Sequence, residues 1–391
     1  MTRTLATGNH VAGHALAMAG EANRNARGCC AGAYPITPQT EIIEYLSDYP
    51  FQKGRIVLVE SEHSAMAVCM GAALAGARTF TASSSNGLAY MTENIFAAGY
   101  YRLPTVMMAV NRTLGPPWNI WVDQGDSLMM RDAAWLQFYC DSHQDLLDTT
   151  LMAFRIAEDK RIMLPVIVAL DGFVTSHTQM VVDLPTQEQV DALLPDCAIP
   201  HGLHHDHPTT VGGLTWPSET ELHRYEIQQS MEAVVGVLDE ARDEFEAIFG
   251  RRPAGAMETF DTEDAETIVV ACNTMARTLH NVVTERRKQG EKIGMIRAKL
   301  FRPFPRKELL DAIGPQVKKV AVLDRNHSPG SGGIFWQEIA TTLRERPDVL
   351  LQDYLVGLGG GDVTPDVINK IIGDLHKRTK SSDPDWRDRT A

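Results

Sequence analysis

Three short segments of the chain combine polar side chains that could bind and activate a small molecule carrying a carboxylate. Residues 34–38 (Tyr-Pro-Ile-Thr-Pro) hold Thr37 between two prolines, residues 60–63 (Glu-Ser-Glu-His) contain Glu62, and Arg112 follows an apolar run. An arginine fork can grip a carboxylate, and a threonine hydroxyl can donate a hydrogen bond to a carbonyl oxygen. Each residue also has a plain interpretation: a turn residue for Thr37, a surface ion pair for Arg112, and a carboxylate favoured by a helix dipole for Glu62. The residues alone leave both interpretations open.

Each segment follows a short apolar run with the character of a buried β-strand. Strands alternating with helices indicate a parallel α/β sheet with helices on both faces. In such sheets the site lies at the carboxyl ends of the strands, so we expect the loops after these strands to hold the chemistry. The predicted strands are Gly28–Tyr34, Ile56–Val59, Thr79–Thr81, Thr105–Val110 and Leu164–Leu170, and the loops are 34–38, 60–63, 83–87, 111–126 and 171–177.

The middle of the chain predicts one long helix that separates two α/β units. Over residues 218–249, apolar residues recur in alternating steps of four and three and form a single seam. Gly250 and Pro253 end this pattern. The seam fits either packing within its own domain or docking between domains or subunits. We predict a first domain over residues 1–250, a linker over 251–262 and a second α/β domain over 263–391.

Composition and charge argue against several classes of function. The net charge of -13 comes with no basic stripe, which disfavours a nucleic-acid partner. The six cysteines include no C-x-x-C pair, so we expect no metal site in this chain and a reducing, cytoplasmic location. The histidines of residues 201–207 fit a solvated loop better than a metal site. The N-terminus lacks the apolar core of a signal peptide, and no apolar run is long enough for a membrane span.

Taken in order, these motifs resemble the α subunits of pyruvate-type 2-oxoacid:ferredoxin oxidoreductases. The resemblance implies an α/β fold: a pyrimidine-binding domain of the thiamine-diphosphate-enzyme type with a parallel sheet, followed by a domain like the C-terminal domain of transketolase. It begins at residues 34–38 and 60–63 and covers nearly the whole chain, continuing at residues 81–87, 111–112, 119–121, 123–126, 131–132, 170–173, 212–213, 302–304, 323–325, 328–330 and 357–359.

The resemblance implies an activity that several chains share. The reaction would be thiamine-diphosphate-dependent oxidative decarboxylation of a 2-oxoacid with coenzyme A, giving acyl-CoA and CO2. A β subunit would hold the diphosphate and Mg²⁺, other subunits of γ and δ type would hold iron–sulfur clusters and coenzyme A contacts, and ferredoxin or a similar carrier would take the electrons. This chain fits the α role because it has no G-D-G followed by Asn and no cluster-ligating cysteine series. The alternatives are a non-redox thiamine-dependent carboligase subunit and a non-catalytic scaffold.

By the same resemblance, Glu62 is the carboxylate beside N1′ of the thiamine aminopyrimidine, where a shared proton makes the 4′-amino group basic. Thr37 and Arg112 match the residues that contact the 2-oxoacid, and with Glu62 they speak against a scaffold. The other candidates are Tyr34, Pro35, Ile36, Ser85 and Asn86 for binding the cofactor, and Asn111, Pro117 and Trp118 for the loop that borders the substrate.

The chain departs from the family's pattern in this substrate loop. Gly115–Trp118 and Gln124 stand where smaller residues and a histidine are expected. A changed pocket wall would fit a different side chain. An aromatic or branched 2-oxoacid, for example of the phenylglyoxylate type, is therefore the alternative to pyruvate.

Overall fold

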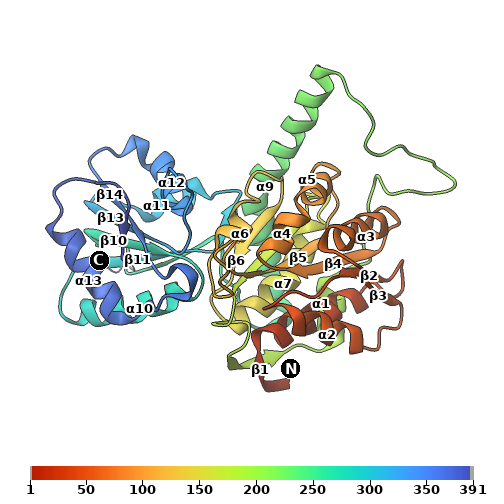
Figure 1. Cartoon of the computed structure of the whole chain (residues 1–391), viewed down its shortest axis with the longest axis horizontal. Coiled ribbons are helices and arrows are strands. Elements are labelled where there is room, and N and C mark those ends of the chain that lie inside the picture. Colours follow the sequence, from red (N-terminus) through yellow and green to blue (C-terminus); the bar gives the residue numbers. More distant parts are fainter. Residues whose placement is uncertain (1, 388–391) are drawn as a thin grey trace.

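A seven-stranded sheet forms the larger of two α/β lobes in the computed structural model, which describes residues 2–387 (Figure 1). The strand order is β12-β6-β7-β5-β4-β2-β3, and every neighbouring pair is parallel except β12 with β6. The strands β4, β5 and β7 are buried along their whole length, as continuous apolar runs are when helices cover both faces. The bounds are β2 (Cys29–Ala33), β3 (Gly54–Leu58), β4 (Arg78–Ser83), β5 (Val106–Asn111), β6 (Leu136–Tyr139), β7 (Val166–Asp171) and β12 (Leu300–Arg302).

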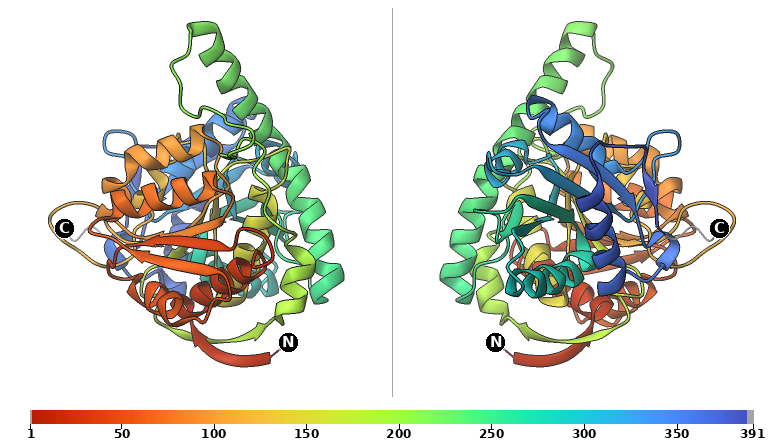
Figure 2. Two further views of the ribbon diagram at one scale, coloured as in Figure 1. Left: turned by 90° about the vertical axis from the view of Figure 1, so that its right-hand side faces the viewer. Right: turned by 90° about the vertical axis from the view of Figure 1, so that its left-hand side faces the viewer.

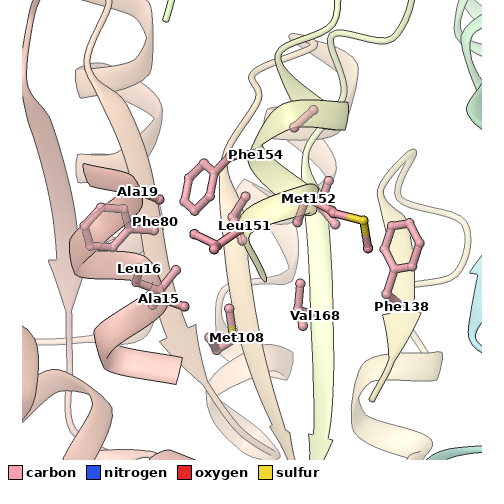
Figure 3. Packing of buried hydrophobic residues seen from close by; sticks show 14 of the residues in the cluster. Ala15, Leu16, Ala19, Phe80, Met108, Phe138, Leu151, Met152, Phe154 and Val168 are labelled. Atoms are coloured by element: carbon pink, nitrogen blue, oxygen red, sulfur yellow. The ribbon is translucent and has the colours of Figure 1, made fainter. Parts of the chain in front are cut away.

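Helices cover both faces of this sheet. One face carries α1 (Gly8–Glu21), α2 (Thr40–Asp48) and α7 (His143–Ala157), and the other carries α3 (Glu62–Leu74), α4 (Asn86–Tyr90) and α5 (Thr92–Tyr100). In Figure 3, Leu16 of α1 and Phe154 of α7 pack toward Phe80 and Met108 of the strands. The alanine-rich α1 can approach the sheet closely, since a Cβ on Gly20 would lie 2.8 Å from the Cys29 sulfur. The predicted parallel α/β class is confirmed.

The sequence analysis did not predict several shorter elements of this lobe. The strands β1 (Thr2–Thr7) and β8 (Gln179–Leu184) form a separate antiparallel ribbon. Their longest apolar run is the three residues Met180–Val182, which is too short to mark a strand in the sequence. The strands β6 and β12, the helices α6 (Gly125–Leu128) and α8 (Gln187–Leu193) and the 15-residue helix α7 were also not predicted.

The predicted long helix is α9 (Pro217–Phe249). It begins one residue early, at Pro217, and Glu219 accepts a hydrogen bond from the Trp216 backbone at 2.7 Å. From Ile227 onward its seam is buried against the larger lobe, so this part packs within its own domain. The first turns and the loop before them extend beyond the body of the lobe (Figures 1 and 2). None of the described helices is both long and apolar enough to cross a membrane.

A six-stranded sheet forms the smaller lobe, in the order β15-β14-β13-β10-β11-β9. All neighbours are parallel except β9 with β11. The helices α10 (Asn273–Lys288) and α13 (Pro365–Lys377) cover one face, and α11 (Arg306–Ala312) and α12 (Ile334–Thr342) the other. The remaining bounds are β9 (Met257–Phe260), β10 (Thr267–Ala271), β11 (Ile293–Ala298), β13 (Lys319–Asp324), β14 (Leu350–Leu355) and β15 (Asp385–Trp386), with 3₁₀ turns at η1 (Leu343–Glu345) and η2 (Leu358–Gly360).

Part of the predicted linker is a strand. β9 lies inside residues 251–262 and pairs antiparallel with β11, so the description of this segment as linker was wrong for Met257–Phe260. Glu258 on β9 pairs with Arg297 on β11 at 2.5 Å, an ion pair that only the folded sheet reveals. The domain bounds of 1–250 and 263–391 stay predictions.

A buried cluster of charges joins the two lobes. Lys299 is fully buried, and its ammonium group binds Asp145 near the start of α7 at 2.7 Å. Arg297, also buried, binds the other oxygen of the same carboxylate. Burial alone would raise the pKa of Asp145, but these two cations hold it well below its ordinary value. Next to this cluster, Tyr139 of the larger lobe contacts Phe335 of the smaller one, with ring centroids 5.5 Å apart.

We predict that Asp145→Asn lowers the free energy of unfolding by about 3–5 kcal/mol, because the buried Lys299 loses its carboxylate partner while Arg297 keeps only its pairs with Asp141 and Glu258. The measurement is denaturant unfolding of the purified chain. Since the pKa of Asp145 is depressed, its stabilisation is fully present above about pH 4 and is lost as the pH falls below that. The control is Glu240→Gln, which removes an exposed pair with Arg161 and should change stability by less than about 1 kcal/mol. Equal effects of the two substitutions would contradict the prediction.

Candidate active site

The loops after the parallel strands meet at one edge of the large sheet, as predicted. β2 ends before residues 34–38, β3 before residues 59–61, β4 before residues 84–85 and β5 before residues 112–124. Parallel strands present their carboxyl ends together, which gathers side chains distant in sequence.

Glu62 is the first residue of α3, and its carboxylate lacks a hydrogen-bond donor. Ser61 caps the helix by accepting a bond from the Ser64 backbone at 3.2 Å. The Glu62 residue is 7% exposed, and no group within residues 2–387 donates to its carboxylate. A nearly buried carboxylate without donors is unfavourable, so this one is placed for a group from outside the chain.

Gly87 packs directly against Glu62. A Cβ on Gly87 would lie 2.7 Å from Oε1 of Glu62 and 2.4 Å from Oγ of Ser83, closer than real Cβ atoms come. A larger residue at position 87 would therefore displace the carboxylate. A carboxylate without a donor can share a proton with a ring nitrogen such as N1′ of an aminopyrimidine, so the residues present are compatible with thiamine diphosphate.

Arg112 and Thr37 lie together. The Arg112 guanidinium donates a hydrogen bond to the Thr37 carbonyl at 2.8 Å, and its backbone donates to Asp126 at 3.0 Å. No carboxylate of the described chain lies within ion-pair distance of the guanidinium, so the interpretation of Arg112 as a surface ion pair was wrong. The Thr37 side chain is exposed, as are Pro35 and the outer face of this loop, whereas Tyr34 and Ile36 are half-buried.

Ser85 and Asn86 form a turn between β4 and α4. Ser85 has a φ of 49°, in the left-handed region that residues with a side chain rarely adopt. Its backbone N–H donates to Asp126 at 2.8 Å and its hydroxyl to the Thr113 carbonyl. Asn86 accepts a bond from the Gly115 backbone at 3.2 Å. The turn and the loop after β5 are therefore one connected unit.

Two of the predicted substrate-loop residues lie outward and one lies inward. Pro117 and Trp118 are exposed, Trp118 by 66%, so this chain alone does not close a pocket around them. Asn111 is fully buried and donates to Asp126 at 2.8 Å and to Ser127 at 2.7 Å. The expectation that Asn111 borders the substrate was wrong, because its amide is used inside the fold.

Two buried carboxylates hold segments together at this edge of the sheet, and the sequence did not predict them. Asp126 binds the ends of β4 and β5, and burial raises its pKa to about 7. Asp171, at the end of β7, accepts bonds from Asn273 at 2.8 Å and Arg325 at 3.4 Å in the smaller lobe. Both lie in motifs of the family resemblance, yet nothing in the sequence says that they are buried.

Gln124 is also fully buried, between the lobes. Its amide donates to Asp171 at 3.4 Å, and its oxygen accepts from the Cys272 thiol at 3.2 Å. We expected Gln124 to border the substrate pocket. In this chain its side chain is buried and lines no open pocket.

Cavities and exposed histidines lie away from these residues. A cavity of about 940 Å³ lies between α9 and α11 and is lined by none of the predicted site residues. His204, His205 and Asp206 place ligand atoms within 4.8 Å of one another, but all three side chains are exposed. The sequence predicted a solvated loop at these histidines, and it did not predict that the Asp206 carboxylate would lie beside them.

Comparison with known proteins identifies the family. Residues 22–243 match the family described as pyruvate flavodoxin/ferredoxin oxidoreductase, thiamine diphosphate-binding, and residues 265–368 match pyruvate:ferredoxin oxidoreductase core domain II. The chain belongs to the pyruvate flavodoxin/ferredoxin oxidoreductase family. The resemblance to this family and the expectation of an oxidoreductase are thereby confirmed. Membership in an oxidoreductase family argues against a subunit of a non-redox carboligase.

Relatives of this oxidoreductase family cover almost the whole chain. It is 43% identical to the pyruvate synthase subunit PorA of Methanothermobacter thermautotrophicus over 342 residues, covering 87% of this chain and 88% of the relative. It is 40% identical to the ketoisovalerate oxidoreductase subunit VorA of Pyrococcus horikoshii over 387 residues, covering 97% and 95%.

A solved structure shares the fold. The 2-oxoglutarate:ferredoxin oxidoreductase from Magnetococcus marinus superposes with a TM-score of 0.73 at 21% identity, over 95% of this chain and 65% of that one.

Proposed function

We propose that this chain is the α-type subunit of a 2-oxoacid:ferredoxin oxidoreductase. The complex would convert a 2-oxoacid and coenzyme A to acyl-CoA and CO2, releasing one proton and two electrons to ferredoxin or a similar carrier. The observation that carries the proposal is the Glu62 carboxylate, nearly buried, without a donor among the described residues and packed against Gly87. It lies at the same sheet edge as Arg112 and Thr37.

Glu62 has the role of proton holder. Thiamine diphosphate, when bound, supplies the electron sink that decarboxylation needs. Glu62 would share a proton at N1′ of the aminopyrimidine from its place at the start of α3. The half-buried Tyr34 and Ile36, with Pro35, Ser85 and Asn86, would form the chain's part of the cofactor site.

Arg112 and Thr37 would bind the two polar ends of the 2-oxoacid. The Arg112 guanidinium donates from Nη1 to the Thr37 carbonyl and from Nε to the Asn119 carbonyl at 3.5 Å, which orients it and leaves Nη2 for a carboxylate. The exposed Thr37 hydroxyl can donate to the keto oxygen. This pair would therefore select any 2-oxoacid, irrespective of its side chain.

The open site implies a partner chain. Trp118, Thr37 and Pro35 are exposed around Arg112, and PorA and VorA are by name subunits of larger enzymes. A β-type subunit would supply the diphosphate and Mg²⁺ site. The six cysteines are free thiols, five of them buried, so iron–sulfur clusters are assigned to γ- and δ-type subunits. Free thiols also suit a cytoplasmic location.

Two substrates have support from the relatives. One relative is named for pyruvate and the other for ketoisovalerate. The PorA match is the more identical, 43% against 40%, and the VorA match covers more of this chain, 97% against 87%, so pyruvate and a branched 2-oxoacid are both candidates. An aromatic 2-oxoacid is the further alternative, since Trp118 stands in the loop beside Arg112.

We predict that Glu62→Gln lowers kcat of the assembled complex by at least roughly a hundredfold, because glutamine cannot exchange a proton at N1′. The assay is coenzyme-A-dependent dye reduction, with thiamine diphosphate content measured in parallel. The matched control is Glu60→Gln: Glu60 is exposed and binds only the Ser64 hydroxyl, at 2.5 Å. Near-normal turnover of the cofactor-loaded Glu62→Gln complex would refute the role.

We expect the isolated chain to bind thiamine diphosphate weakly or not at all, because the diphosphate and Mg²⁺ contacts belong to another subunit. Titration calorimetry with and without Mg²⁺ measures this. Tight, magnesium-dependent binding to the single chain would contradict a shared site.

Arg112→Lys should lower kcat/KM by roughly ten- to a hundredfold, since lysine keeps the charge but loses the fork, and a charge-assisted bond is worth about 1.5–3 kcal/mol. The loss should be similar for pyruvate, a branched and an aromatic 2-oxoacid, because all carry the same carboxylate. Trp118→Ala serves as the comparison and should change the ranking of the three substrates instead. A silent Arg112→Lys would remove Arg112 from the substrate site.

A further inference from the structure

We propose that Asp126 is a positioning residue of the active site, holding Arg112 and the Ser85–Asn86 turn in fixed relation to each other. The inference rests on the proposed function for what Arg112 binds. Asp126 lies on α6, beyond the substrate loop, and is fully buried. It therefore cannot touch the substrate and can act only through the residues it holds.

The Asp126 carboxylate joins two strand ends. One oxygen accepts hydrogen bonds from the backbone of Ser85 at 2.8 Å and of Arg112 at 3.0 Å. The other accepts from the Asn111 amide at 2.8 Å and from the Ser127 backbone at 2.8 Å. Four donors converge on one carboxylate and fix its orientation. The ends of β4 and β5 are thus fixed to a single rigid group.

The residues that Asp126 binds are themselves part of the candidate site or contact it. The bond to the Arg112 backbone fixes where the Arg112 side chain begins, and the guanidinium of that side chain binds the Thr37 carbonyl at 2.8 Å. Holding the Ser85 backbone stabilises its unfavourable φ of 49°, and Asn86 then accepts from Gly115 in the substrate loop at 3.2 Å. One carboxylate therefore controls the place of the substrate fork, the cofactor-side turn and the base of the substrate loop.

Two neighbouring aspartates give a matched pair for the test. Asp123 lies three residues before Asp126, and it accepts a hydrogen bond from the Gly125 backbone at 2.8 Å at the start of the same helix. No hydrogen bond connects its side chain to Arg112 or Ser85 among residues 2–387. Asp123→Asn therefore perturbs α6 without touching the fork or the turn.

The experiment is steady-state kinetics of the assembled complex with Asp126→Asn, Asp123→Asn, Arg112→Ala and the double variant Asp126→Asn/Arg112→Ala. In Asp126→Asn an amide NH2 faces two N–H donors, so the strand ends shift. We expect kcat/KM for the 2-oxoacid to fall roughly ten- to a hundredfold, mainly through KM. Asp123→Asn should stay within about twofold. In the Arg112→Ala background, Asp126→Asn should cause little further rise in KM, because the residue through which it acts is gone.

The outcomes separate this inference from the proposed function. An unchanged KM for Asp126→Asn while Arg112→Ala raises KM overturns the positioning role alone. Additive effects in the double variant show that Asp126 does not act through Arg112, and they also overturn it. A silent Arg112→Ala instead removes Arg112 from the substrate site, which is a failure of the proposed function and of this inference together.

A milder variant covers the case in which Asp126→Asn does not assemble. Asn111→Ala removes one of the four donors and keeps the carboxylate. We expect KM to rise severalfold in the assembled complex, with thiamine diphosphate content unchanged. Lower thermal stability with an unchanged KM would mean that this network is only structural, and would overturn the proposal.

Discussion

The buried Asp171 carboxylate fixes how the two lobes meet, and the site depends on that meeting. Asp171 ends β7 of the large sheet and accepts bonds from Asn273 and the Thr274 backbone, at the start of α10, and from Arg325, which follows β13. The carboxyl ends of two parallel sheets are thereby turned toward each other. A buried charge keeps such an arrangement because removing one partner leaves the other unpaired in a low dielectric. The buried ion pair of Asp145 with Lys299 is a second buried charged contact that joins the two lobes.

The substrate loop is held at its base by Asp126 and at its far side by the smaller lobe. On the far side, the Asn119 amide donates to the Gly359 carbonyl at 3.0 Å and the Gly360 backbone donates to Val122 at 3.0 Å. Packing of Trp121 against Phe173, with centroids 4.6 Å apart, closes the remaining side. A loop fixed in this way can present Arg112 without waiting for substrate, so little conformational entropy is lost on binding.

The sequence predicted the parts of the fold that leave a periodic trace, and it missed the parts that depend on distant contacts. β5 and β7 are continuous apolar runs, and α9 carries a regular seam, so their places followed from local pattern. The three-residue β12 leaves no such trace, because it exists only by pairing with β6 from the other half of the chain. Glu62, Thr37 and Arg112 were predicted from the family resemblance, and the structure places the segments that contain them at one edge of the sheet. Asp126 was not found, since nothing local distinguishes a buried aspartate that accepts four bonds from a solvated one.

The same contrast explains why specificity and chemistry are located differently. Arg112 is oriented by bonds inside this chain, which supports the proposal that it binds the carboxylate of a 2-oxoacid. Trp118, at the tip of the loop, has an exposed side chain. An exposed indole has low selectivity in water, because a substrate side chain gains little from contacting a group that solvent also reaches. The tip becomes a selective surface only when another chain covers it and excludes that water. On the proposed roles, discrimination among 2-oxoacids would be a property of the interface, whereas binding of their common carboxylate would belong to this chain.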